Sequence, residues 1–185
     1  MRCNQRAGAA LLLAAAWAGN AAAQPTEQTA REAYFKAVAE YFDLPASEVS
    51  ILSEWRLPAD EIPVVLFLAG HAGVSPEAVV ALRTSGRGWA ELARRYRLDA
   101  AQFHVPLSAS APTGVLEGAY GSYRSLPATR WHEITLEDSD IVGLVNLRLL
   151  SETLRRAPDD VLAGAGGEGS WVDLYARLMG DGLGP

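Results

Sequence analysis

Residues 75–95, SPEAVVALRTSGRGWAELARR, align without a gap on residues 157–177, APDDVLAGAGGEGSWVDLYAR. The matching or chemically similar pairs are Pro76 with Pro158, Glu77 with Asp159, Val79 with Val161, Ala81 with Ala163, Trp89 with Trp171, Glu91 with Asp173, Leu92 with Leu174 and Arg95 with Arg177. A gapless match that includes two tryptophans predicts one helical unit used twice. The repeated positions are hydrophobic residues, helix caps and glycines, so the repeat predicts a structural scaffold. No set of chemically reactive residues is repeated.

Hydrophobic periodicity predicts helices on either side of this stretch. The segment IPVVLFLA at 62–69 is the most apolar part of the chain after its first residues, and periodicity alone allows a strand there as well as a helix. Asp60 as an N-cap and Gly73 as a left-handed C-terminal residue favour a helix, with Pro63 in its first turn. The corresponding segment of the second half, 139–156, also has a helical pattern. We therefore expect an all-α fold, a short-helix array of two related helical repeat units of about 80 residues each plus an N-terminal helix.

Composition along the chain predicts its division. Residues 106–122, PLSASAPTGVLEGAYGS, are rich in Pro, Ser, Ala and Gly and show little periodicity, which is typical of a linker. We expect a signal peptide at 1–23, the N-terminal helix at 24–43, helical unit 1 at 44–105, the linker at 106–122, helical unit 2 at 123–180 and a frayed tail at 181–185.

The first 23 residues have the pattern of a secretory signal. Arg2 and Arg6 form a basic start, residues 7–18 are apolar, and 21–23 form an A-x-A cleavage site. Cleavage near Ala23 would leave 185 − 23 = 162 residues without a cysteine, so an exported protein would be stabilised by its core alone. We expect the mature protein to be periplasmic or secreted.

Charge and hydropathy exclude several classes of partner. Without Arg2 and Arg6 the chain has 16 − 2 = 14 basic and 22 acidic residues, a net charge of 14 − 22 = −8. Such a balance disfavours binding to nucleic acid or to an anionic membrane. After the signal no segment approaches 18 unbroken apolar residues, so we expect no transmembrane segment.

The run V-x-x-L-R-x-x-G-x-G-W-x-x-L-A at 79–93 resembles a signature of uncharacterised exported bacterial all-helical proteins. The resemblance covers the two repeats, without the N-terminal helix or the linker, and it implies a helical fold but no activity. The second copy departs from the signature, because Ala165 stands at the place of Arg83 and Glu168 at that of Gly86.

The two tryptophans have two interpretations. Trp89 and Trp171 could stack on sugars or peptides, or each could fill the gap between its helix and the preceding one. Their equivalent positions in the repeat, flanked by glycines that allow close packing, favour structural anchors.

Oppositely charged segments lie in the two halves. Residues 83–97 contain five arginines and one glutamate, a local charge of +4, whereas 133–140 contains four carboxylates. The arginines favour an anionic partner, since guanidinium groups bind carboxylates and phosphates bidentately, although a solvated helix end is the simpler interpretation. The acidic segment could cap a helix, or it could dock on the basic segment within one chain or between chains. The candidate binding residues are Arg83, Arg87, Arg94 and Arg95.

No motif predicts a metal or a cofactor. The three histidines, His71, His104 and His132, are scattered, and neither a Cys/His cluster nor a G-x-S-x-G motif is present. The residues of a Ser-His-Asp triad meet only in space, so the sequence does not exclude such a triad. We expect a non-enzymatic envelope protein that interacts with an envelope protein or an anionic envelope component. The alternatives are a helical peptidoglycan hydrolase, with an isolated acid such as Glu152, and a carrier of a small apolar ligand between the two units.

Overall fold

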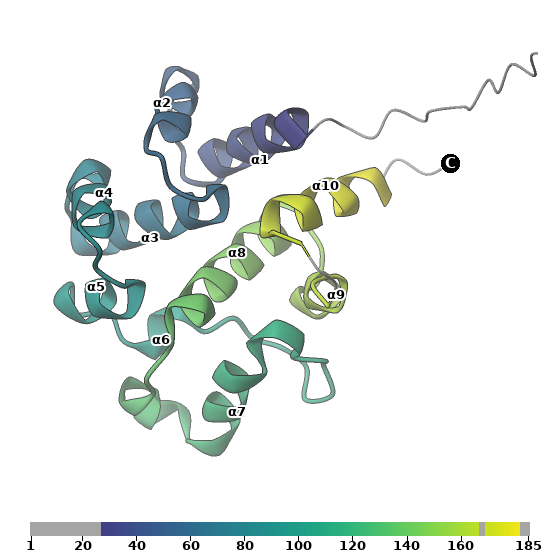
Figure 1. Ribbon diagram of the computed structural model, residues 1–185. Helices are drawn as coiled ribbons and strands as arrows, with labels where there is room; N and C mark the ends of the chain where they lie inside the picture. Colours follow the sequence, from purple (N-terminus) through teal and green to yellow (C-terminus); the bar gives the residue numbers. More distant parts are fainter. Residues whose placement is uncertain (1–26, 167–168, 182–185) are drawn as a thin grey trace, which may run out of the picture.

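The computed structural model describes residues 27–166 and 169–181 (Figure 1). Helices make up 72% of this part of the chain and it contains no strand, which confirms the all-α class. No helix within it is long and apolar enough to cross a membrane. The predicted signal peptide and the last four residues lie outside the described residues.

Ten α-helices follow one another in this part of the chain. They are α1 (Glu27–Tyr41), α2 (Val49–Glu54), α3 (Ile62–Ala72), α4 (Pro76–Thr84), α5 (Trp89–Arg95), α6 (Ala100–Phe103), α7 (Glu117–Ser125), α8 (Asp138–Leu154), α9 (Pro158–Gly164) and α10 (Trp171–Asp181). Short 3-10 turns lie at Ala46–Glu48, Ala59–Glu61, Gly114–Leu116 and Ala128–Glu133.

Helix α8 is the central element of the fold. It is 17 residues long, and α1, α3, α5, α6, α9 and α10 all pack against it (Figure 1). A helix that is surrounded in this way must be apolar around most of its circumference. Its buried residues are Ile141, Gly143, Leu144, Val145, Asn146, Leu147, Leu149, Leu150 and Ser151.

Helix α3 forms where the apolar run predicted a helix, with one correction at its start. Pro63 lies in the first turn, and Gly73 ends the helix in the left-handed conformation at φ +65°, both as expected. Asp60 is not an N-cap. It lies inside the 3-10 turn Ala59–Glu61. The residue that precedes this turn is Pro58, whose carbonyl accepts from the amide of Glu61 (3.0 Å).

Several helices start at a residue whose side chain caps the first turn. The hydroxyl of Ser75 accepts from the amide of Ala78, and Asp99 forms a capping box with Gln102. At the start of α10, Ser170 and Asp173 bond reciprocally, amide to side chain in both directions (2.9 and 3.2 Å). These local signals therefore determine where short helices begin.

The linker prediction was wrong for residues 114–122. This stretch contains the 3-10 turn Gly114–Leu116 and most of α7. The buried residues of the segment are Leu116, Ala119, Tyr120 and Tyr123. Their spacing of three, four and seven residues is helical, and it was masked by the glycines and serines between them. The tyrosine hydroxyls of α7 donate to the carbonyls of Val105 and Ala100 (both 2.7 Å), which ties the helix to the first half of the chain.

Helix α1 joins the two ends of the described chain. It packs against α10, and the two helices run side by side in Figure 1. Tyr34 is fully buried and meets Tyr175 of α10 edge to face, with ring centroids 5.8 Å apart. Helix α1, which lies within the segment predicted as the N-terminal helix at 24–43, is thus part of the core.

A buried polar network connects α1, α8 and the start of α3. The side chain of Asn146 is fully buried in α8 and accepts a short hydrogen bond from the hydroxyl of Tyr34. Its amide donates to the carbonyls of Asp60 and Val142 (both 2.8 Å). Because buried polar groups are costly when unpaired, this network fixes one arrangement of three elements.

We expect Asn146→Leu to lower the free energy of unfolding by about 2–4 kcal/mol, because it removes the hydrogen bonds that Asn146 makes to the buried Tyr34 hydroxyl and to the Asp60 carbonyl. Tyr34→Phe should cost less, about 1–2 kcal/mol, since it leaves one acceptor unpaired. Urea unfolding followed by circular dichroism measures both. A loss of less than about 0.5 kcal/mol for Asn146→Leu would contradict the role of the network.

Candidate functional site

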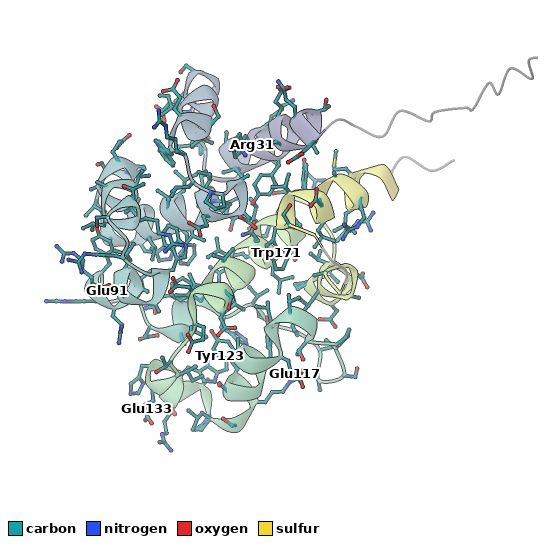
Figure 2. All side chains as sticks on the ribbon, in the orientation of Figure 1. Arg31, Glu91, Glu117, Tyr123, Glu133 and Trp171 are labelled. Carbon is teal, nitrogen blue, oxygen red and sulfur yellow. The ribbon has the colours of Figure 1, made fainter. Side chains whose placement is uncertain are left out.

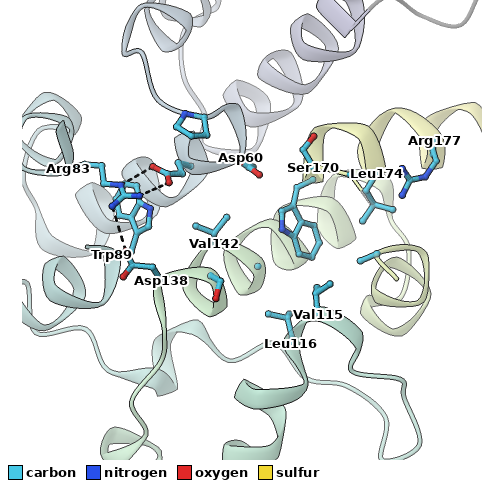
Figure 3. Close-up of a pocket in the computed structure, with 17 residues that line it drawn as sticks. Asp60, Arg83, Trp89, Val115, Leu116, Asp138, Val142, Ser170, Leu174 and Arg177 are labelled. Atoms are coloured by element: carbon cyan, nitrogen blue, oxygen red, sulfur yellow. Dashed lines mark hydrogen bonds and ion pairs between the residues drawn. The ribbon is translucent and has the colours of Figure 1, made fainter. Parts of the chain in front are cut away.

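A cleft of about 390 Å³ lies where four helices begin, and we call it the central cleft (Figure 3). Its wall includes the turn before α3 and the first residues of α5, α8 and α10. Its volume falls within the range of small-molecule sites in proteins. The cleft is therefore the first candidate for a functional site.

One wall of the central cleft is apolar. Trp171 and Leu174 come from α10, Val142 from α8, and Leu116 from the 3-10 turn before α7. Gly143 makes their packing possible, because a Cβ atom there would lie 2.6 Å from Cδ2 of Leu116 and 3.4 Å from Cζ2 of Trp171. A glycine on α8 thus lets the indole and the leucine lie directly on the helix backbone.

The opposite wall carries a charged cluster centred on Arg83. Its Nη2 and Nε donate to the two carboxylate oxygens of Glu61 at 2.6 and 2.9 Å. Its Nη1 donates to the carbonyl of Arg87 (3.1 Å), and the guanidinium lies over the ring of Trp89, 4.9 Å from the centroid. Three nitrogens of this guanidinium donate hydrogen bonds and one of its faces lies on an indole ring, so Arg83, the first of the predicted contact residues, acts as a structural anchor.

Asp138 links this cluster to the second half of the chain. Its carboxylate accepts a hydrogen bond from the amide of Ala90 (2.9 Å). The same carboxylate lies 3.6 Å from Nη1 of Arg83, an ion pair that a dashed line marks in Figure 3. It therefore acts as the N-terminal cap that Gly88 cannot supply to α5. A Cβ atom on Gly88 would lie 2.9 Å from this carboxylate, so glycine makes the approach possible. The acidic segment thus docks on the basic segment within one chain.

The other three predicted arginines do not line the cleft. Arg87 pairs with Glu91 one turn further along α5, and Glu91 lies at the periphery in Figure 2. Arg94 donates to the carbonyl of Ala90 (3.3 Å), and Arg95 is exposed on the same helix. The four arginines therefore do not converge on one site.

The two tryptophans differ in their surroundings. Trp89 is fully buried, as an anchor should be, and its Nε1 has no hydrogen-bond acceptor among the described residues. Trp171 is partly exposed and lines the central cleft. Equivalent positions in the sequence thus give one core residue and one residue that a ligand could reach.

Asp60 is the cleft carboxyl that the sequence did not identify as functional. Burial raises its pKa above the ordinary range, its own backbone amide opposes this, and Glu61 and Asp173 raise it further. No basic side chain of the described residues lies within ion-pair distance of it. In the sequence, Asp60 was recognisable only as a possible helix cap. The surroundings of its carboxyl depend on how α10 approaches the turn before α3, which a local sequence pattern does not reveal.

A second hollow of about 370 Å³ is bordered by an aromatic cluster. His104 stacks on Trp131, with centroids 4.1 Å apart, and meets Tyr123 edge to face at 4.7 Å. The indole N–H of Trp131 donates to the carbonyls of Tyr123 and Leu126 (both 3.2 Å). The hydroxyls of Tyr120 and Tyr123 and the indole N–H of Trp131 all donate to backbone carbonyls, so the cluster stabilises α7.

Other candidate chemistry is distributed away from the cleft. Glu152 is exposed on α8 and does not line the cleft. Glu133 pairs with Arg130 at the surface, where Figure 2 labels it. Within residues 27–166 and 169–181, no group of three or more His, Cys, Asp or Glu side chains is placed to hold a metal ion.

Comparison with known proteins gives no match to a family model, to a curated protein or to a solved structure. The functional argument therefore depends on the geometry of the central cleft.

We expect Arg83→Met to lower the free energy of unfolding by about 1–3 kcal/mol, because the half-buried carboxylate of Glu61 loses its partner. Arg95→Ala, a change on the exposed face of α5, should stay within about 0.5 kcal/mol of the wild type. Urea denaturation of the two variants in parallel makes the comparison. Equal and small effects would show that Arg83 is not an anchor.

Burial lowers the pKa of His104 below its ordinary value of 6.5, and the charge of Arg148 lowers it further. The unfolded chain then takes up a proton before the folded one, so stability is complete above pH 6.5 and falls as the pH drops below it. His104→Phe keeps an aromatic ring and removes the titration. Thermal unfolding between pH 7 and pH 5 should show a shallower decline for the variant, and parallel profiles would contradict this role of His104.

Proposed function

We propose that this chain is a non-enzymatic binding protein of the cell envelope that holds a small, largely apolar ligand in the central cleft. The observation that carries the proposal is the cleft itself, with the partly exposed indole of Trp171 on its apolar wall. A concave site with apolar walls and a few polar groups is the usual form of a small-molecule site. Export to the envelope is supported by the signal-like first 23 residues.

We further propose that the cleft lies between two copies of one helical unit. The order α3, α4, α5 resembles the order α8, α9, α10, with a tryptophan at the first residue of the last helix in each set. Helix α5 packs on α8, and α10 packs on α8 and on the turn before α3. In this arrangement each unit contributes helix starts to the same cleft, as a carrier between two units requires.

An arginine face for a protein or anionic envelope partner is less well supported. Arg83 is occupied by Glu61, and Arg87 by Glu91. Only Arg94 and Arg95 extend from α5 without a carboxylate partner within ion-pair distance among the described residues. Two exposed arginines on a solvated helix end need no partner to explain them.

A hydrolase has one specific observation in its favour, which is the raised pKa of Asp60 in a cleft. An acid catalyst acting on a glycosidic bond also needs a second carboxylate as base or nucleophile. The other two carboxylates of the cleft are already bonded, Glu61 to Arg83 and Asp138 to the amide of Ala90. Binding without catalysis is therefore the function that this geometry favours.

The proposed function predicts that the protein binds prodan, an uncharged naphthalene dye whose emission shifts to the blue in apolar surroundings. Ser139→Trp adds an indole at the wall of the cleft and should weaken binding at least about tenfold, or 1.4 kcal/mol. Ser125→Trp, at the exposed end of α7, is the matched control and should bind as the wild type does. Fluorescence titration gives the three dissociation constants.

Failure of the wild type to bind the dye, or equal binding by Ser139→Trp, would contradict a ligand site in the cleft. Release of soluble fragments from purified peptidoglycan by the wild type, but not by Asp60→Asn, would contradict the non-enzymatic part of the proposal. Circular dichroism of each variant establishes that it is folded.

A further inference from the structure

Asp60 differs from the other carboxyls around the central cleft, because among the described residues no basic side chain lies within ion-pair distance of it and only its own backbone amide offsets the effect of burial. Glu61 is held by two hydrogen bonds from Arg83, and Asp138 accepts from the amide of Ala90. Asp173, which lies near Asp60, accepts from the amide and hydroxyl of Ser170 at the start of α10 (2.9 and 2.8 Å). Asp60 takes part in none of these arrangements.

The basic groups near Asp60 are engaged elsewhere. Arg31 shares a neighbouring hollow of about 310 Å³ with Asp60, and its guanidinium lies over the ring of Phe35, 5.0 Å from the centroid. Arg177, at the other side of the cleft in Figure 3, donates to the carbonyl of Gly164 (3.2 Å). The charges that act on Asp60 most strongly are the carboxylates Glu61 and Asp173. Its surroundings therefore favour a cation.

An anionic ligand is disfavoured in the same place. The start of a helix by itself attracts anions, and several helix starts face the cleft. The chain's own carboxylates already occupy these positions, as Asp138 does at α5 and Asp173 at α10. A further anion would meet the uncompensated charge of Asp60.

The wall next to Asp60 is suited to an organic cation. Trp171 lines the cleft with its partly exposed indole, and Val142 and Leu116 continue the apolar surface. An ammonium group is attracted both by a carboxylate and by the face of an indole ring. An inorganic cation would gain nothing from the apolar wall, whereas an amine with an aryl or short alkyl group would contact both features.

We propose that the ligand of the central cleft is a small amine, with its ammonium group bound by the carboxylate of Asp60 and its apolar part against Trp171. The proposal rests on the function proposed above and specifies the chemistry of the ligand. Recognition requires Asp60 to be ionised, so binding weakens at acidic pH.

Three probes of similar shape test this proposal: 2-phenylethylammonium, the uncharged 2-phenylethanol and the anion phenylacetate. Isothermal titration calorimetry of the purified protein at pH 7.5 should show the ammonium binding at least about tenfold more tightly than the alcohol, and phenylacetate most weakly. Asp60→Asn should reduce the affinity for the ammonium to that for the alcohol and leave the alcohol unchanged.

The matched control is Asp160→Asn, which removes an exposed carboxylate from the first turn of α9, away from the cleft, and should keep the preference. Asp60→Ser provides a second variant if Asp60→Asn does not fold by circular dichroism. The amine proposal is overturned if the wild type binds the alcohol as tightly as the ammonium, or if the preference survives the loss of Asp60. In both cases binding of the alcohol still supports an apolar site, whereas failure of all three probes and of prodan overturns the proposed function itself.

Discussion

The hydrogen bonds of Asn146 are the interaction on which the rest of the structure depends. This side chain lies at the middle of the central helix, where no water can satisfy it, so its three partners must be held in place by the packing around them. One partner is Tyr34 on the first described helix, and another is the backbone carbonyl of Asp60. The same network that closes the core therefore positions the residue that we propose to bind the ligand. A loss of packing around Asn146 would therefore lower the stability of the protein and also change the position of Asp60 in the cleft.

Arginine side chains connect helices that are distant in the sequence. The sole cysteine of the chain is Cys3, within the predicted signal, so short helices must be joined by other means. Arg148 donates to the carbonyls of Gln102 and His104 (both 2.9 Å) at the end of α6, and Arg156 donates to the carbonyl of Leu178 (2.9 Å). These bonds satisfy carbonyls near helix ends, where intrahelical partners are lacking. Arg148 and Arg156 thus have structural roles.

The two sides of the central cleft have different electrostatic characters. On one side Arg83, Glu61 and Asp138 neutralise one another and join the two halves of the chain. On the other side Asp60 lies beside an apolar wall, and no basic side chain of the described residues lies within ion-pair distance of it. A closed network stabilises a fold but has no remaining capacity for a ligand, whereas an unpaired carboxyl costs stability and retains that capacity. This asymmetry is the reason for locating the site at Asp60 and Trp171.

Local signals determined the helices. Pro63, Gly73 and the caps at Ser75, Asp99 and Ser170 act within one turn of the chain, so they could be predicted from the sequence. Helix α7 was missed because its apolar spacing lies among glycines and serines, and its stability comes from tyrosine hydroxyls that bond to distant carbonyls.

Only the tertiary structure decided that Arg83 is an anchor, that Trp89 and Trp171 have different surroundings, and that Asp60 faces a cleft. The physical reason is range. A cap acts through bonds between neighbours in the sequence, whereas the burial and charge of these side chains depend on which helix starts meet in space.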